Sequence, residues 1–370
     1  MIFLAFVLVI LLLAVFFEIY TRRTGRNCHM QFILVVSVLL FLQSGLRNVA
    51  VGPDTFAYCK MYERDINENW SELFYRVKNY YLDGVGKDPG YPVFEKMAAY
   101  VVSNYQVYLL LVAGIFFSAL ALFLKRNTRT VPDALIAFLL YLTLFYGFFS
   151  VTGTRQTLAT ACSLFGYEVF IKRRKWWPFL LLMLLASTIH KSVLLFIPFY
   201  FIAFIKPRKW HYWTMAILFP ALMVYAVPVS SFLKNLGGYE DYGVYESTGT
   251  YRFTSILLLF SMVAFWRMRA VLREGPTTRP LYIALMLSLF FTPLTWVNPS
   301  AMRVVQYFSI FLMALAPKLV NSFRISSVKT ERMAYVVCLT VLLAYAVLRG
   351  LGTEYAFFWQ EMELPENYYR

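Results

Sequence analysis

Apolar stretches of helical length alternate with short charged connections along most of the chain. A membrane-spanning helix needs about 20 mostly apolar residues, with a range of roughly 17–25. By this measure we expect about twelve spans, several of them short. They lie near residues 1–20, 29–46, 104–124, 131–150, 155–171, 177–190, 191–205, 213–233, 252–268, 281–297, 300–317 and 333–348. The pattern predicts an all-α, polytopic membrane helix bundle.

Composition supports the membrane assignment. Apolar residues make up 60% of the chain and charged residues 15%, whereas soluble domains are about 25% charged. The mean hydropathy is +0.58. The first apolar stretch has no small-residue cleavage site and ends at Glu18-Ile19-Tyr20 before a basic run. We therefore interpret it as a retained helix, with a cleaved signal peptide as the alternative.

The basic residues predict the orientation of the bundle. Most of the 35 Lys and Arg residues fall on six alternate connections, near residues 22–26, 125–129, 172–175, 206–209, 267–279 and 318–332. Positively charged loops stay in the cytoplasm, so both termini are expected outside a bacterial cytoplasmic membrane. The net charge of +15 follows from this asymmetry. It does not indicate nucleic-acid binding, which needs the cations on one soluble face.

We expect one membrane domain over 1–370, with two larger exterior loops and an exterior tail. The first loop, 47–103, contains a helix start at Gly52-Pro53-Asp54-Thr55 and an amphipathic stretch over 70–81 that suits an interfacial helix. The second loop spans 234–251, and the tail spans 349–370. Both are rich in aromatic residues, which is compatible with sugar stacking but is also typical of an aromatic belt.

The cysteines and histidines carry no metal or disulfide pattern. Four cysteines are distributed between predicted spans and loops, and three histidines are far apart in sequence. We expect no disulfide framework, no metal site and no cofactor.

Cations at the exterior mouths of the spans need a separate explanation. Snorkelling accounts for any one of them taken alone. It does not account for several exterior hairpins, otherwise poor in positive charge, that each place a cation or histidine just inside a span. An ionisable residue in such a place indicates function by default. The set consists of Arg47, Arg155, His190 with Lys191, Arg252 and Arg303.

Several of these positions lie in short motifs that resemble the EpsG branch of the Wzy-type polysaccharide polymerases. The motifs follow the family's order from about 45 to 310. They are Gly45-Leu46-Arg47 with Val51-Gly52-Pro53-Asp54-Thr55 and Tyr58, Asp88-Pro89-Gly90-Tyr91, Thr154-Arg155-Gln156 with Ala159, Ala186-Ser187-Thr188-Ile189-His190-Lys191-Ser192, and Arg303 with Tyr307. Lys191 directly after the histidine departs from the family pattern, and Pro53 occupies a variable slot; neither breaks the pattern.

The resemblance implies a GT-C-like membrane glycosyltransferase that joins repeat units of O-antigen, capsule or exopolysaccharide on the outer face of the membrane. The donor would be an oligosaccharide linked to a polyprenyl diphosphate. Membrane lipid, a chain-length regulator and a flippase of the same pathway are the implied partners. The residues fit this chemistry, because guanidinium groups bind diphosphate through paired hydrogen bonds.

Each candidate residue can be given an expected role in displacement at the anomeric carbon. Arg155 and Arg303 would hold the leaving diphosphate, with Arg47 and Arg252 as further contacts. His190 is the preferred base, because the adjacent Lys191 disfavours the imidazolium form. Asp54 is the competing base or a contact to acceptor hydroxyls. Further substrate contacts are expected from Lys191, Gln156, Tyr58, Tyr307, Asp88 and Tyr91.

Three other functions remain open. A membrane acyltransferase acting on polysaccharide could use a lone histidine near the membrane, but it would not require four exterior arginines. A flippase or exporter of the same lipid-linked sugars would also need cations, but through the full depth of the membrane and usually with repeat symmetry. Here the polar residues concentrate at one mouth, and no repeat is evident. An O-antigen ligase attacks the same anomeric carbon, so only the resemblance favours a polymerase.

Overall fold

The computed structural model describes residues 2–102, 104–237, 250–352 and 354–364. The chain divides into two compact units, one formed by Met1–Leu194 with Leu339–Arg370 and the other by Leu195–Cys338. We call them unit 1 and unit 2 and describe each by itself. Every regular element in the described residues is helical, apart from one isolated bridge between Arg47 and Phe357. The expected all-α fold is therefore confirmed.

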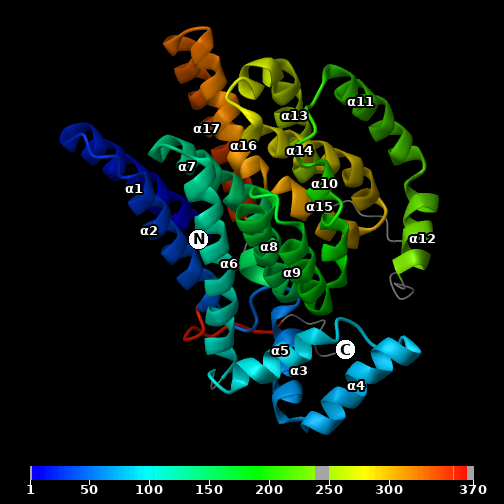
Figure 1. Ribbon diagram of the computed structural model, residues 1–370. Helices are drawn as coiled ribbons and strands as arrows, with labels where there is room; N and C mark the ends of the chain where they lie inside the picture. Colours follow the sequence, from blue (N-terminus) through cyan, green and yellow to red (C-terminus); the bar gives the residue numbers. More distant parts are fainter. Residues whose placement is uncertain (1, 103, 238–249, 353, 365–370) are drawn as a thin grey trace. The chain divides into compact units, whose positions relative to one another are not determined.

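Unit 1 contains the first nine α-helices (Figure 1). Their bounds are α1 Ile2–Thr24, α2 His29–Gly45, α3 Thr55–Asn67, α4 Trp70–Asp83, α5 Gly90–Ala99, α6 Tyr105–Asn127, α7 Val131–Leu140, α8 Thr154–Gly166 and α9 Trp176–Ile189. Wider π-helical turns follow α7 over Tyr141–Phe145 and Gly147–Thr152, and follow α8 over Tyr167–Ile171. Such turns are frequent next to functional sites.

Unit 2 contains the next seven α-helices, and α17 Val328–Gly350 runs from unit 2 into unit 1. The bounds in unit 2 are α10 Phe199–Ile202, α11 Lys209–Val224, α12 Ala226–Gly237, α13 Tyr251–Leu272, α14 Arg279–Phe291, α15 Met302–Ser309 and α16 Leu312–Ser322. Short 3₁₀ helices lie at Lys191–Phe196, Pro276–Thr278, Thr292–Trp296, Pro299–Ala301 and Phe323–Ile325.

Four described helices are long and apolar enough to cross a membrane: α1, α6, α13 and α17. Two bent pairs, α11 with α12 and the helices of Pro299–Ser309 with Leu312–Ile325, raise the number to six if each pair is one span. The chain is therefore a multi-pass membrane protein. Helices lie over all twelve expected stretches, but bends and short segments break several of them, so the count of twelve spans stays a prediction.

Local sequence explains where several helices begin. The Asn104 side chain accepts a hydrogen bond from Val107 N at the start of α6. Thr130 and Asp133 form a reciprocal capping box on α7, and Asn69 with Glu72 forms one on α4. Each cap satisfies backbone N–H groups that have no partner within the helix. The expected helix start at Gly52-Pro53-Asp54-Thr55 lies at the beginning of α3, and the amphipathic stretch over 70–81 corresponds to α4.

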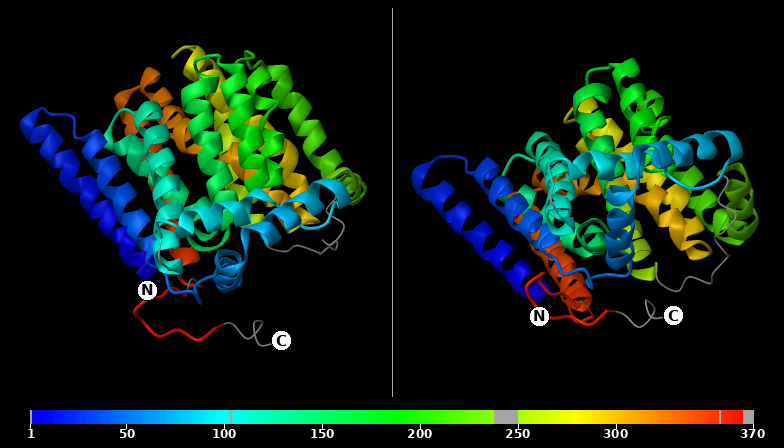
Figure 2. Two further views of the ribbon diagram at one scale, coloured as in Figure 1. Left: turned by 60° about the horizontal axis from the view of Figure 1, so that its bottom comes forward. Right: turned by 90° about the horizontal axis from the view of Figure 1, so that it is seen from below.

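The connections of unit 1 gather at its two ends as the alternating charge pattern implies. At one end, Asn27 Nδ2 donates to Arg129 O at 3.1 Å and Lys172 Nζ donates to Asn127 Oδ1 at 3.1 Å. The opposite end of the unit carries α3, α4 and α5, beside the end of α6 at which that helix begins (Figure 1). The described part of the C-terminal tail also lies there (Figure 2). Residues 238–249, most of the expected loop 234–251, and residues 365–370 lie outside the described residues.

Candidate active site

Asp88 is the centre of the polar group in unit 1. Arg155 Nη1 donates to its Oδ2 at 2.8 Å, and the backbone N–H of Lys191 donates to its Oδ1 at 3.0 Å. His190 Nδ1 lies 3.4 Å from Oδ2. Burial raises the pKa of Asp88, but the His190 contact, the Arg155 charge and the Lys191 N–H outweigh it, so the pKa lies below its ordinary value. The carboxylate is therefore ionised and acts only as an acceptor.

Asp88 determines which nitrogen of His190 can act as a base. Because an ionised carboxylate cannot donate, Nδ1 carries the hydrogen in this contact. The neutral ring then has Nε2 as its basic atom. His190 is the C-cap residue of α9 and is only 4% exposed. A carboxylate that orients a histidine in this way is the arrangement that fixes a catalytic imidazole in other enzymes.

Arg155 is held on three sides at the start of α8. Besides its ion pair with Asp88, its Nε donates to Tyr58 Oη at 3.3 Å. Its guanidinium carbon lies 5.6 Å from the ring centroid of Tyr58 and 5.7 Å from that of Tyr91, within cation–π range. The side chain keeps 20% exposure. A guanidinium has donors beyond the two used here, so Arg155 is a fixed cation that can still bind an anion.

Two glycines allow the segments that carry these groups to approach closely. A Cβ on Gly90 would overlap Thr188 Oγ1 and would lie 2.6 Å from Thr188 Cβ, so the start of α5 rests directly on the end of α9. Gly52 has φ +84°, and a Cβ there would lie 2.6 Å from Val151 Cγ1. Thr55 Oγ1 also donates to Val151 O at 2.9 Å. The first contact places Asp88 beside His190, and the second places α3 beside the segment that leads to Arg155.

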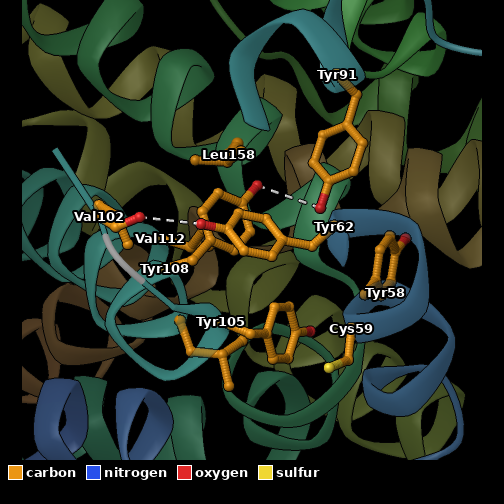
Figure 3. Close-up of a cluster of buried hydrophobic side chains, with 10 residues drawn as sticks. Tyr58, Cys59, Tyr62, Tyr91, Val102, Tyr105, Tyr108, Val112 and Leu158 are labelled. Atoms are coloured by element: carbon orange, nitrogen blue, oxygen red, sulfur yellow. Dashed lines mark hydrogen bonds between the residues drawn. The ribbon is translucent and has the colours of Figure 1, made fainter. Parts of the chain in front are cut away.

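Tyr58 and Tyr91 belong to a cluster of buried tyrosines (Figure 3). Tyr108 donates to Tyr91 Oη at 3.2 Å, and Tyr62 donates to Val102 O at 3.2 Å. The Tyr62 and Tyr108 rings stack with centroids 4.8 Å apart. Tyr58 and Tyr91 were expected to contact substrate. In the structure both contact Arg155, and Tyr91 is also joined to α6 through Tyr108.

Arg47 lies in a different environment. It is 5% exposed, its Nη1 donates to Ser44 O at 2.6 Å, and its Nε lies 3.5 Å from Thr55 Oγ1. The C-terminal tail covers this region, because Asn48 N donates to Ala356 O and Phe358 N donates to Leu46 O, both at 2.9 Å. The Tyr355 hydroxyl donates to Gln43 O. The tail thus pairs with the segment that follows α2 (Figure 2).

The other expected residues are distributed over both units. In unit 1, Asp54 is the half-buried N-cap residue of α3, and Gln156 is buried beside Arg155 in sequence. In unit 2, Arg252 is exposed at the start of α13 and Arg303 is half-buried at the start of α15. Tyr307 is buried, with its ring centroid 6.4 Å from that of Phe196.

Sequence reasoning missed several contributors to this end of unit 1. Glu95 of α5 and Asp65 of α3 are both buried. Tyr105 of α6 donates to Thr55 O at 3.1 Å. Glu95 follows Tyr91 by one helical turn, which is the one available signal that it shares the Tyr91 side of α5. In the described residues, no group of three or more His, Cys, Asp or Glu side chains is placed to hold a metal.

The fold and site define a multi-pass helical membrane protein with an ordered arginine–aspartate–histidine group where the loops of one unit meet. The EpsG family model matches residues 30–359, so the chain belongs to the EpsG family. This links the protein to exopolysaccharide biosynthesis at a membrane. No curated protein and no solved structure matches the chain.

Proposed function

We propose that the protein is a membrane glycosyltransferase that polymerises oligosaccharide repeat units carried on a polyprenyl diphosphate. The bundle is proposed to have about twelve spans, with the Asp88–Arg155–His190 group on the outer face of the cytoplasmic membrane. Family membership supports the pathway. The single observation that carries the chemistry is a carboxylate that contacts both a fixed arginine and a histidine.

The proposed reaction is a direct displacement at the anomeric carbon. An acceptor sugar hydroxyl attacks this carbon while His190 Nε2 takes the hydroxyl proton. The bond from the anomeric carbon to the diphosphate oxygen breaks, and the electron pair leaves with the lipid diphosphate. Arg155 stabilises the charge that develops on that oxygen. With one displacement and no covalent intermediate, the anomeric configuration inverts.

The proposed role of Asp88 differs from the substrate contact expected from the sequence. Its oxygens already accept from Arg155 and Lys191 and lie beside His190. We assign it the positioning of the base and of the anion-binding arginine. Arg303 and Arg252 remain proposed contacts to the diphosphate, and Asp54 remains the proposed contact to acceptor hydroxyls. Arg47 would become a further contact to the diphosphate only if the C-terminal tail that covers it opened.

The test is polymer synthesis by purified protein from a defined lipid-diphosphate oligosaccharide. Arg155→Ala should lower turnover by about 10²–10³, the usual cost of removing a preorganised anion-stabilising donor. His190→Gln should abolish elongation and leave single repeats on the lipid. Arg173→Ala, at an exposed position, and His211→Gln in unit 2 are matched controls. Normal product ladders from both site variants would refute the proposal, and transbilayer movement of the donor without any elongation would indicate a flippase.

A further inference from the structure

A pair of buried carboxyl groups lies between α3 and α5, the helices that deliver Tyr58 and Tyr91 to Arg155. Asp65 and Glu95 are each 0% exposed. Arg64 and Arg76 both contact Asp65 Oδ1, at 2.8 and 3.0 Å. Within the described residues, neither Glu95 oxygen nor Asp65 Oδ2 has a hydrogen-bond partner of good geometry. Ionised carboxylates in this state would be very costly, so this pair needs a proton.

Glu95 is the member of the pair that holds the proton. Two arginine side chains contact Asp65, whereas Glu95 faces Asp65 and a group of phenols. Burial above all raises the pKa of Glu95 to about 9, and the charge of Asp65 adds to this, against opposing effects of Tyr91 and Arg155. The phenols that face Glu95 from α3, α5 and α6 are Tyr62, Tyr91, Tyr105 and Tyr108.

The position of this pair gives it a consequence for the site. Tyr58 precedes Asp65 on α3 by two helical turns, and both are buried. Tyr91 precedes Glu95 on α5 by one turn, and Asp88 lies just before that helix. Arg155 thus contacts both helices at Tyr58 and Tyr91, and the carboxyl pair lies one to two turns further along the same helices. Separation of the pair would withdraw Tyr58, Tyr91 and Asp88 from Arg155.

We propose that Glu95 is a positioning residue that works as the neutral acid, with its O–H donated to Asp65 so that one shared proton holds α3 against α5. The proposal rests on the complete burial of both side chains and on their carboxyl oxygens that lack other hydrogen-bond partners. Only its effect on polymer synthesis rests on the proposed function. When the helices part, this hydrogen bond breaks. Above pH 4.5 the solvated Glu95 then ionises: its O–H bond breaks, the electron pair stays on the carboxylate, and the proton passes to water.

The proton makes the opening of α3 from α5 depend on pH. When the helices separate, Glu95 enters water and its pKa returns towards the ordinary 4.5. Because the closed state has the higher pKa, its stability is greatest below pH 4.5 and is lost as pH rises towards 9. Over that window the population of the open state should rise about tenfold per pH unit. Above pH 9 the dependence should level off.

Cys59 provides a measurement of this opening that does not depend on catalysis. It lies on α3 in the tyrosine cluster and is buried. In a variant with Cys28, Cys162 and Cys338 replaced by Ala, labelling of Cys59 by a maleimide reports separation of the helices. Burial raises the pKa of the Cys59 thiol to about 11, with Glu63 contributing. The labelling rate therefore also depends on the ionisation of this thiol, and that dependence has to be separated from the opening of the helices. The ratio of labelling rates with and without Glu95→Gln removes that common factor.

Glu95→Gln keeps a donor for Asp65 but cannot ionise. Between pH 6 and pH 8 the labelling rate with the natural Glu95, divided by the rate in Glu95→Gln, should rise by about 100-fold. Lys96→Met is the control, because Lys96 Nζ donates to Ile66 O at 3.1 Å and joins the same helices without a carboxyl proton. It should raise labelling by a constant factor and leave the pH slope unchanged. A ratio that is the same at pH 6 and pH 8 would overturn the proposal.

A second measurement needs no cysteine replacement. The infrared carbonyl band of a protonated carboxyl should be present at pH 7 in the otherwise natural chain and lost in Glu95→Gln. Absence of that difference would also overturn the proposal. If purified protein makes no polymer at any pH while the labelling slope and the carbonyl band are found, the proposed function fails and this inference stands.

Discussion

The contact between Gly90 and Thr188 allows a sharp test of how Asp88 is held against His190. In Gly90→Ala, the new Cβ would lie 2.6 Å from Thr188 Cβ. Rotation of Thr188 moves its hydroxyl but not its Cβ. The start of α5 must therefore move by about 0.8 Å so that the distance between the new Cβ and Thr188 Cβ reaches the 3.4 Å of an ordinary contact. The packed interface has no free space in which the side chains could adjust instead.

That displacement is enough to break the contact that anchors Asp88. The bond from Lys191 N to Asp88 Oδ1 is 3.0 Å, and a further 0.8 Å or so takes it beyond hydrogen-bond range. A hydrogen bond to a charged group contributes roughly 1.5–3 kcal/mol. If the whole of this loss raises the activation barrier because His190 is no longer oriented, turnover should drop by about 10- to 150-fold. The assay is polymer synthesis at matched protein concentration, together with the melting temperature.

A second substitution separates this explanation from general damage. Thr188→Gly removes both atoms of the overlap and leaves the Thr188 backbone carbon at 3.1 Å as the nearest neighbour. The double variant should therefore recover most of the lost turnover. Gly114→Ala in α6 is the matched control, since its Cβ would lie at an ordinary 3.5 Å from Phe41. Full turnover in Gly90→Ala, or no recovery in the double variant, would refute the reasoning.

Two further predictions concern the partners of Arg155. Asp88→Asn keeps the shape but removes the charge, so turnover should fall by about 10²-fold with little change in lipid-donor affinity, as steady-state kinetics would reveal. Since the pKa of Asp88 is lowered, the contribution of its carboxylate to turnover should persist at neutral pH and be lost only below its ordinary pKa of 3.8. A pH–rate profile of the natural chain in which this contribution is already lost near pH 6 would contradict the prediction. Tyr58→Phe keeps the ring under the guanidinium and loses one 3.3 Å hydrogen bond, so turnover should fall only about threefold, whereas Tyr58→Ala should cost about 10-fold or more. Equal effects of the two Tyr58 variants would show that ring stacking on Arg155 is unimportant.

Hydrophobic patterning predicts the all-α fold well. The lengths of the apolar stretches predict less well where the helices are continuous and where they break. Every expected span coincides with helix, because an apolar run in lipid must satisfy its own backbone hydrogen bonds. The breaks could not be predicted in the same way. The turn at Tyr225 bends α11 against α12 by 83°, and π-helical turns interrupt the segment after α7. A pattern of apolar residues alone marks neither break, because both lie inside continuous apolar stretches.

The sequence indicates which residues are candidates for the site, but it does not indicate the contacts that join them. Arg155 at a helix start and His190 at a turn follow from the positions of ionisable residues at span ends. The contacts of Asp88 with Arg155 and His190 join residues 67 and 102 positions apart. No local spacing encodes such contacts. The same holds for Glu95 and Asp65, whose pairing depends on how α5 packs on α3.

Arg47 shows that a cation at the mouth of a span is not by itself evidence of a ligand-binding group. Arg155 keeps part of its surface and pairs with a carboxylate, whereas Arg47 is nearly buried and donates to the Ser44 backbone carbonyl under the C-terminal tail. A structural role predicts that Arg47→Ala lowers the free energy of unfolding by roughly 1.5–3 kcal/mol in the absence of any donor lipid. Tyr355→Phe, which removes the bond to Gln43 O, should cost less, and the two effects should be non-additive because both loosen the same paired segment. Thermal unfolding in detergent measures both. If Arg47→Ala leaves unfolding unchanged and yet stops polymer synthesis, the tail must open during the reaction, and Arg47 then belongs with Arg155 as a contact to the diphosphate.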